Sequence, residues 1–205
     1  DVAARLRTEV PRLDSERVQP IPLGLDHIAA ASAPEQPDAD LAEIVEKLGG
    51  KRFVAVLGND FQHKNRDFAI AVWQRVLASG QSCDLVLAGL HVKSSSSKAQ
   101  EERLLAKHVD LRGTVHTAGH ISSASRAWLL ANASAVLYPS SAEGFGFVPY
   151  EAAALGTPST FADFGPLKEI AHLSGLPSGW IIDEFAADLT TLLADPKAAE
   201  QRVAD

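Results

Sequence analysis

The sequence predicts an α/β fold: a Rossmann-like parallel sheet in three layers, with helices on both faces. The first observation behind this prediction is that short apolar runs, typical of buried strands, alternate along the chain with helix-like segments. Such alternation produces right-handed βαβ crossovers, which place helices on both faces of a parallel sheet. The second observation is size, because 205 residues with 46% hydrophobic content fit one globular domain, or one domain with an arm.

The N-terminal part of the chain predicts an arm and a linker. The first ~20 residues have a helical pattern, and a proline-containing segment, residues 18–22, follows them. The segment 29–40 is rich in Ala, Pro and Asp, which is typical of a loop or linker. We therefore expect an arm and linker over residues 1–50 and the folded domain over residues 51–205.

The first part of the domain alternates strands with helices. Phe53–Leu57 is short and β-branched, which indicates a buried strand. In Asn65–Ser79 the apolar residues recur at helical spacing. Asp84–Ala88 is a second apolar run, closed by Gly89, and the charged segment Ser97–Val109 predicts the next helix.

The middle of the domain continues the alternation. Thr114–Thr117 is a weaker strand, and Ser122–Asn132 has small and aromatic residues on one side, as expected of a helix. The apolar run Ala133–Tyr138 predicts another strand. Val148–Leu155 predicts a helix that ends at Gly156, a residue type common just after a helix.

The last part of the domain contains shorter elements. Ser159–Phe161 predicts a short strand, and Pro166–His172 and Glu184–Ala194 predict helices. Gly179–Ile182 lies between these two helices and predicts a final strand.

Charge and composition exclude some classes of protein. The net charge is −7, from 26 acidic against 19 Lys and Arg residues, and no basic block occurs. Since nucleic-acid binders usually carry a basic stripe, we expect no nucleic-acid partner. No run of 18 apolar residues and no signal-peptide pattern occurs.

The cysteine and methionine content gives two further expectations. The single cysteine, Cys83, lies in an apolar run, which indicates a small core residue of a reduced, cytoplasmic protein. The sequence contains no Met, so we expect a piece of a longer protein.

Two loops that follow predicted strands have the composition of a ligand site. In open parallel sheets, ligands lie beyond the carboxyl ends of the strands. The segment from Gly58 to Asn65 places a glycine, polar side chains and Lys64 ahead of a helix N-terminus, which suits an anion. The alternative is a solvated loop in which Asn65 caps the helix. The segment Phe164–Leu167 shapes another helix entry with Gly and Pro.

The third such segment, Tyr138–Pro158, combines two carboxylates with a glycine-rich turn. Glu143 precedes the turn and Glu151 is expected in the first turn of the next helix. Carboxylates accept hydrogen bonds from sugar and ribose hydroxyls, and the N–H groups between them can donate to phosphate. That combination fits a nucleotide sugar. The alternative is that Glu151 only stabilises the helix start and Glu143 is a surface residue, since Glu35 and Glu43 show the same spacing.

The arrangement of these motifs resembles the retaining GT-B glycosyltransferases, the "group 1" family. The strand–turn–helix motifs that carry the resemblance are Leu137-Tyr138-Pro139-Ser140, Glu143-Gly144-Phe145-Gly146-Phe147, Glu151-Ala152 and Gly156-Thr157-Pro158. Further matching segments occur, in family order, at Ile21–Asp26, at Gly58 with His63-Lys64-Asn65, at Ala118–Ile121 and at Gly165–Glu169. The resemblance extends over residues 18–193, nearly the whole chain.

The resemblance implies one half of a GT-B fold, with residues 1–50 as an N-terminal arm and interdomain linker and residues 51–205 as a nucleotide-sugar-binding domain. By analogy, Glu143 bonds the donor sugar, Glu151 the ribose, and Lys64 the pyrophosphate, so that Glu143 and Lys64 are the candidate catalytic residues. The base is expected near Val115 and His116. The full set of implied donor-binding residues is Gly58, His63, Lys64, Val115, His116, Glu143, Gly144, Phe145, Gly146, Phe147 and Glu151.

The resemblance also implies the partners and the reaction. The nucleotide sugar is a substrate, no cofactor and no metal ion is expected, and the acceptor is a sugar, lipid or glycan. The missing N-terminal domain of the same protein would hold that acceptor, so we expect the fragment alone to be inactive. Retention of the anomeric configuration is the family expectation. The expected location is the cytoplasm, which for the full-length protein includes the inner face of the membrane.

One departure concerns the phosphate loop, and two other functions stay open. The family commonly has an Arg shortly before the Lys, and here His63 stands in its place, with Arg66 as a conceivable substitute. The alternatives to a glycosyltransferase are a nucleotide-sugar epimerase of the same architecture and a non-catalytic α/β binding module.

Overall fold

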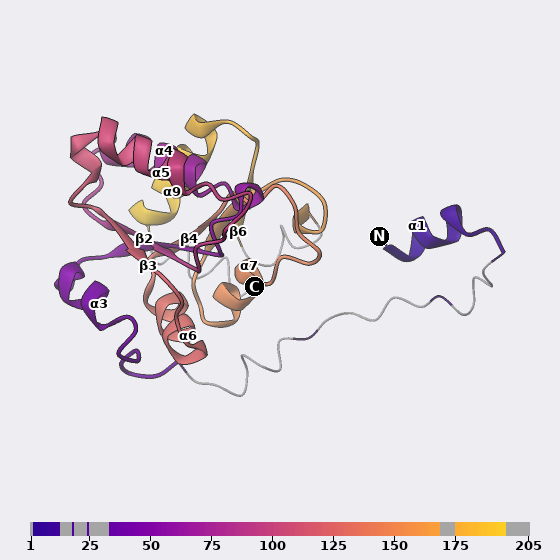
Figure 1. Cartoon of the computed structure of the whole chain (residues 1–205), viewed down its shortest axis with the longest axis horizontal. Coiled ribbons are helices and arrows are strands. Elements are labelled where there is room, and N and C mark those ends of the chain that lie inside the picture. Colours follow the sequence, from indigo (N-terminus) through magenta and orange to yellow (C-terminus); the bar gives the residue numbers. More distant parts are fainter. Residues whose placement is uncertain (1, 13–17, 19–23, 25–32, 169–174, 196–205) are drawn as a thin grey trace.

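The sheet of this protein is entirely parallel. The computed structural model describes residues 2–12, 18, 24, 33–168 and 175–195 (Figure 1). Its six strands lie in the order β3-β2-β1-β4-β5-β6, and every neighbouring pair is parallel. The predicted α/β, Rossmann-like class is confirmed. In this strand order the direction of winding reverses between β1 and β4, which is where parallel sheets of this kind bind ligands.

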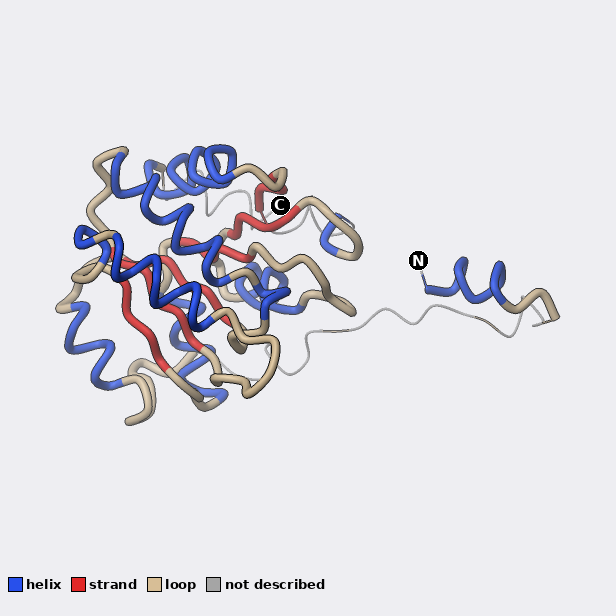
Figure 2. Tube along the Cα trace, turned by 45° about the horizontal axis from the view of Figure 1, so that its top comes forward, coloured by secondary structure: helices blue, strands red, loops and turns tan. Residues whose placement is uncertain are grey.

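The strands are short and the helices connect them on both faces (Figure 2). The strands are β1 (Phe53–Leu57), β2 (Asp84–Ala88), β3 (Val115–Ala118), β4 (Ala135–Tyr138), β5 (Ser159–Ala162) and β6 (Gly175–Ser178). The helices are α1 (Val2–Glu9), α3 (Ala42–Leu48), α4 (Arg66–Ala78), α5 (Lys98–Lys107), α6 (Ser123–Asn132), α7 (Phe147–Ala154) and α9 (Ile182–Ala194), with 3₁₀ turns at Gln62–Lys64 and Val109–Leu111.

Alternating strand residues supply two apolar cores, one on each face of the sheet. Val54 and Val56 of β1 belong to the core beneath α4, α5 and α9, whereas Phe53, Ala55 and Leu57 belong to the core beneath α3, α6 and α7 (Figure 1). All five residues are buried, as expected for a central parallel strand covered on both sides.

The single cysteine lies inside one of these cores. Cys83 is buried and free, as predicted, and it packs on the α4 and α9 side of the sheet. Burial raises the pKa of its thiol to about 11. The thiol therefore stays protonated and unreactive at neutral pH.

The prediction of a strand at Gly179–Ile182 is wrong. The edge strand β6 precedes it, and Ile182 already belongs to α9. Trp180 and Ile181 are apolar, which made them resemble a buried strand, but they are 44% and 54% exposed. The sequence of β6, Gly-Leu-Pro-Ser, does not resemble a strand, because its proline has no N–H to donate to a neighbouring strand. Such a proline is tolerated at the edge of a sheet, where β6 lies.

Helix α3 lies in the segment predicted as arm and linker, yet it packs on the domain. Leu41, Ile44 and Leu48 are buried in the core that contains α6 and α7. The division at residue 51 stays a prediction, and the packed domain includes this helix. Apart from Gly24, the segment 21–26 lies outside the described residues, as does the part of the predicted helix Pro166–His172 beyond Lys168.

Gly89, at the carboxyl end of β2, lets two backbones approach closely. Its φ is +151°, and a Cβ at this position would lie 2.0 Å from the carbonyl oxygen of Gly58. We expect Gly89→Ala to lower the free energy of unfolding by about 2 kcal/mol, because backbone rather than a flexible side chain must move. Chemical denaturation measures the change. Gly113→Ala is the control, since nothing lies within 4 Å of its Cβ position; equal losses in the two variants would contradict the account.

Candidate functional site

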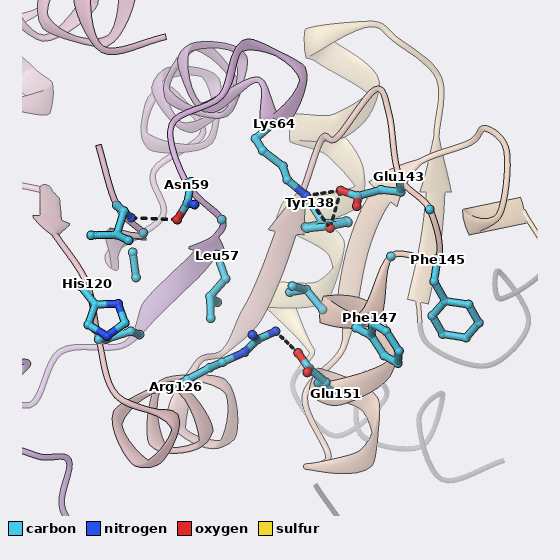
Figure 3. Close-up of a pocket in the computed structure, with 18 residues that line it drawn as sticks. Leu57, Asn59, Lys64, His120, Arg126, Tyr138, Glu143, Phe145, Phe147 and Glu151 are labelled. Carbon is cyan, nitrogen blue, oxygen red and sulfur yellow. Dashed lines mark hydrogen bonds and ion pairs between the residues drawn. The ribbon is translucent and has the colours of Figure 1, made fainter. Parts of the chain in front are cut away.

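A cavity of 780 Å³ opens at the carboxyl ends of β1, β2 and β4 (Figure 3). This volume is ample for a nucleotide-sized ligand. Its lining residues come from the ends of these strands and the loops that follow them, from the loop after β3, from α6 and from α7. They are Leu57, Gly58, Asn59, Lys64, Ala88, Gly89, Leu90, His120, Ile121, Arg126, Tyr138, Glu143, Gly144, Phe145, Gly146, Phe147, Val148 and Glu151.

Lys64 and Glu143 meet on one side of this cavity, although 79 positions separate them in the sequence. Lys64 Nζ donates to Glu143 Oε1, and the Tyr138 hydroxyl donates to the same oxygen at 2.5 Å. Lys64 Nζ also lies 3.3 Å from the Tyr138 hydroxyl oxygen. The Lys64 and Glu143 side chains are 19% and 11% exposed, so the ion pair is only partly open to solvent. Figure 3 shows the three groups converging.

These contacts determine the charge of Glu143. Burial raises the pKa of this carboxyl, but hydrogen bonds from Lys64, Ser140 and Tyr138 outweigh burial and hold the pKa below its usual value. Burial and the hydrogen bond to Glu143 raise the pKa of Tyr138. At neutral pH Glu143 is therefore a carboxylate and Tyr138 a neutral phenol.

Backbone contacts hold the loop after β1 against the loop after β4. The carbonyl oxygen of His63 accepts from the Ser141 N–H at 2.7 Å and from the Ser140 and Ser141 hydroxyls, each at 3.2 Å. Asn65 has a φ of +50° and donates through Nδ2 to the Pro139 carbonyl oxygen at 2.8 Å. Asn65 does occupy the position before α4, but its side chain makes no capping bond there. Its side chain instead ties together the two loops that carry Lys64 and Glu143.

A buried carboxylate, Asp60, connects the loop after β1 to the loop after β2. Asp60 accepts from the Val92 N–H at 2.7 Å and from the Ser96 hydroxyl at 2.9 Å, and it lies 2.7 Å from His91 Nδ1. Burial raises the pKa of Asp60, and these bonds outweigh burial so that the pKa is lowered. Asn59 accepts from the Leu90 N–H at 3.0 Å, so the loops after β1 and β2 form one rim of the cavity.

The glycine-rich turn positions the start of α7 in the cavity. Gly146 has a φ of +87° and precedes the first helical residue, Phe147. A Cβ on Gly146 would lie 2.5 Å from Leu167 Cδ2, so the turn packs closely as well as bending sharply. N–H groups at a helix start favour anionic ligands.

The predicted place of Glu151, in the first turn of that helix, is wrong. Because α7 begins at Phe147, Glu151 lies beyond the first turn, and that turn contains no acidic residue. The helix dipole therefore does not explain this carboxylate. Glu151 is instead buried and forms an ion pair with Arg126 Nη2, and both residues line the cavity (Figure 3).

The structure brings most of the predicted donor-binding residues together. The cavity is lined by Gly58, Lys64, Glu143, Gly144, Phe145, Gly146, Phe147 and Glu151. His63 does not line it: its ring stacks on Phe61 at 5.4 Å, and its carbonyl oxygen joins the two loops.

Val115 and His116 are also absent from the lining. They begin β3 rather than end it, and His116 Nε2 lies 2.7 Å from Asp84 at the amino end of β2. At the carboxyl end of β3 it is His120 and Ile121 that line the cavity instead, and the place of the base stays a prediction.

Arg66 cannot substitute for the missing arginine of the phosphate loop. Its side chain is buried, lies 3.2 Å from Glu101 and donates to the Gly58 carbonyl oxygen at 3.5 Å, and it does not line the cavity.

Sequence reasoning missed Arg126, Tyr138, Asn59 and His120 as site residues. Asn59 and Tyr138 lie within motifs that were singled out, and their polar groups were the available signal. Arg126 gave a weaker signal, as the single charged residue of α6.

The lowered pKa of Glu143 predicts how its contribution to stability depends on pH. A carboxylate with a lowered pKa stabilises the folded state when the pH is above its ordinary pKa of 4.5, and this contribution is lost as the pH falls through the lower pKa of the folded state. We expect the difference in Tm between the parent and Glu143→Gln to be constant from pH 7 to about 5 and to shrink below 4.5. Thermal melting across this range measures it, and a difference that changes mainly between pH 7 and 5 would contradict the assignment.

The described residues contain neither a metal-binding cluster nor a membrane-spanning helix. Within residues 2–12, 18, 24, 33–168 and 175–195, no three His, Cys, Asp or Glu side chains gather as a metal site. None of the helices in these ranges combines the length and apolar character that a membrane crossing requires.

Comparisons with known proteins place this geometry in context. A family model described as "Glycosyl transferases group 1" matches residues 39–204. A glycogen synthase of Mycobacterium tuberculosis is 32% identical over 142 residues, which cover 65% of this chain. The matched region is 32% of that relative, so the chain spans about a third of its length.

Solved structures share the fold at lower identity. WaaG, described as a glycosyltransferase involved in lipopolysaccharide biosynthesis, has a TM-score of 0.70 at 20% identity, over 98% of this chain and 54% of WaaG. An E. coli structure described as trehalose-6-phosphate bound with UDP-2-fluoro glucose has a TM-score of 0.72 at 14% identity, over 89% and 45%. Staphylococcus aureus TarM, solved with UDP and alpha-GlcNAc-glycerol among its ligands, has a TM-score of 0.66 at 18% identity, over 85% and 32%.

Proposed function

Because the chain belongs to the group 1 glycosyl transferases, we propose that it is the donor-binding part of an enzyme that transfers a sugar from a nucleoside diphosphate sugar to an acceptor. The single observation that carries the proposal is the meeting of Lys64 and Glu143, beside the start of α7, where the sheet changes its winding direction. A cation, backbone donors and a carboxylate are thus available within one cavity for the phosphates and hydroxyls of such a donor.

Lys64 and the first turn of α7 are proposed to bind the diphosphate. Cleavage of the bond between the anomeric carbon and the phosphate oxygen places negative charge on the leaving diphosphate. An ammonium group and a helix N-terminus already positioned there stabilise this charge as it develops. Lys64 contacts Glu143 in the structure, so a bound diphosphate would compete with Glu143 for the ammonium group.

Glu143 and Glu151 are proposed to bind the two sugar rings of the donor. Glu143 lies next to Lys64 and so faces the sugar attached to the diphosphate, whereas Glu151 lies apart from them, beside Arg126 of α6 (Figure 3). Glu151 then accepts from the ribose hydroxyls. The structures that contain UDP or UDP-2-fluoro glucose share the fold of this chain, which supports a nucleotide in this cavity.

The remaining features of the reaction belong to the same proposal. The acceptor, a sugar, lipid or glycan, is bound by a second domain of the whole protein. This chain is the C-terminal part of that protein. Transfer retains the anomeric configuration, needs no metal ion and takes place in the cytoplasm. Family membership supports retention, and the free, buried Cys83 supports a reducing compartment.

Titration of the chain with UDP, GDP and ADP, followed by assays of sugar transfer and donor hydrolysis with the matching nucleotide sugars, tests the proposal. We expect weak binding of at least one nucleoside diphosphate and no turnover, because the acceptor side is supplied elsewhere. Binding of none of the three would contradict the donor-site assignment. Robust transfer by this chain alone would contradict the assignment of the acceptor site to a second domain. Interconversion of donor sugars would favour an epimerase.

A further inference from the structure

The Glu143 carboxylate has two donors that come from different elements of the fold. Tyr138 is the last residue of β4, whereas Lys64 ends the 3₁₀ turn that follows β1. The Tyr138 hydroxyl donates to Glu143 Oε1 at 2.5 Å, and Lys64 Nζ donates to the same oxygen. One carboxylate oxygen is thus shared by a hydroxyl and an ammonium group (Figure 3).

The two donors differ in how freely their side chains can turn. Tyr138 is 3% exposed and belongs to the apolar core beneath α3, α6 and α7, which fixes its ring. Lys64 carries its charge on a flexible four-carbon chain at the cavity, with Nζ 5.4 Å from the centre of the Tyr138 ring. The ammonium group can therefore turn to another partner, whereas the phenol hydroxyl stays where β4 places it.

A bound diphosphate would separate the two donors. In the proposed function it draws Lys64 to its phosphate oxygens, and Glu143 then loses its ion pair. The Glu143 side chain is 11% exposed, and a carboxylate this buried is unfavourable without a donor. Burial and the hydrogen bond to Glu143 raise the pKa of Tyr138, so its hydroxyl is protonated at neutral pH and continues to donate.

Ser140 is the other hydroxyl beside Glu143, and it is less suited to this task. Its hydrogen bond contributes to the lowered pKa of Glu143. The carbonyl oxygens of His63 and Ala142 compete for its single hydrogen, at 3.2 and 3.3 Å. Among the described residues, the Tyr138 hydroxyl donates to Glu143 alone.

We propose that Tyr138 is a positioning residue, whose hydroxyl holds the Glu143 carboxylate in place when a nucleoside diphosphate takes Lys64 away from it. The inference rests on the proposed function and deepens it by naming the group that keeps the sugar-binding carboxylate oriented. Lys64 exchanges one partner for another, and Tyr138 remains the constant donor. Without the hydroxyl, release of Lys64 would leave a buried carboxylate short of a donor, so the diphosphate would bind less tightly.

A double-mutant cycle tests the inference, with calorimetric titration of whichever of UDP, GDP and ADP binds the parent best. The four chains are the parent, Tyr138→Phe, Glu143→Gln and the double variant. We expect Tyr138→Phe to weaken binding by about three- to tenfold when Glu143 is present. This is less than the full effect of a hydrogen bond to a charged group, because the bond is lost in the empty chain too. In the Glu143→Gln background the same change should have an effect below about twofold, since a neutral amide loses less without the donor.

The two backgrounds separate positioning from a purely structural role. A structural role would weaken binding by the same factor with Glu143 and with Gln at this position. Equal or tighter binding by Tyr138→Phe than by the parent would show that Glu143 keeps its place without the hydroxyl. Either result would overturn the inference while the proposed function stands. If Tyr138→Phe does not fold, Tyr138→Met provides the same comparison.

Thr157→Val is the matched control for the loss of a buried hydroxyl. The Thr157 hydroxyl donates to the Leu130 carbonyl oxygen at 2.6 Å, and Thr157 is buried outside the cavity lining. This variant should lower the Tm and leave the affinity for the nucleotide unchanged. Failure of the parent to bind any of the three nucleotides would overturn the proposed function, and this inference with it.

Discussion

Lys64→Ala is expected to weaken the binding of a nucleoside diphosphate by about tenfold to a hundredfold. A charge-assisted hydrogen bond of this kind contributes about 1.5–3 kcal/mol. The loss has two physical sources: the ammonium group disappears, and the Glu143 carboxylate, which Lys64 now partly neutralises, is left to repel the phosphates. Calorimetric titration of the variant with UDP, GDP or ADP, whichever binds the parent, measures the change.

The matching nucleoside separates this effect from general damage. The nucleoside has no phosphate, so its affinity should change little in Lys64→Ala. Lys107→Ala, in the last turn of α5 and away from the cavity, is the control for removing a positive charge. Equal losses for the nucleoside and its diphosphate would show that Lys64 does not bind the pyrophosphate.

Glu143→Gln is expected to lower the rate of sugar transfer by the full-length enzyme by something on the order of a hundredfold. The substitution keeps the shape of the side chain but removes its charge. Sugar contacts that position the anomeric carbon act in the transition state, and small errors of position there have effects of this size. A transfer assay at saturating donor measures the rate. Titration with the free nucleoside diphosphate should show no loss of affinity, because the substitution removes a competitor for Lys64.

Glu151→Gln is the comparison that distinguishes the two carboxylates. Because Glu151 is assigned to the ribose, its variant should weaken the free nucleotide and the nucleotide sugar together, by something on the order of 1 kcal/mol. Thermal melting must accompany both variants, since Glu151 is buried and paired with Arg126. If Glu143→Gln transferred sugar at the parental rate, the assignment of Glu143 to the donor sugar would be contradicted.

The two central residues could be predicted because topology alone brings them together. In a parallel sheet the loops after β1 and β4 open at the same edge, and Lys64 and Glu143 each follow one of these strands. The same reasoning placed the glycine-rich turn beside the cavity. The bounds of helices within the domain followed from apolar spacing with errors of only a few residues. The helices that pack on the two faces of the sheet are amphipathic, so their apolar residues recur at helical spacing.

The pairing of Arg126 with Glu151 could not be predicted in the same way. It depends on the direction in which a side chain of α6 leaves its helix and on the exact start of α7, which is fixed by the positive φ of Gly146. The misplacement of Val115 and His116 has a related cause. The sequence pattern located β3 to within one residue, but Val115 and His116 lie inside the strand rather than in the loop after it, and His116 contacts Asp84.

The location of a bound nucleoside diphosphate tests the central claim most directly. A crystal structure of this chain with the best-binding of UDP, GDP and ADP should show the diphosphate between Lys64 and the first turn of α7, with the ribose at Glu151. In that complex Lys64 should contact phosphate oxygens, at least partly in place of Glu143. A nucleotide bound outside the cavity, or one whose diphosphate lies away from both Lys64 and α7, would contradict the account.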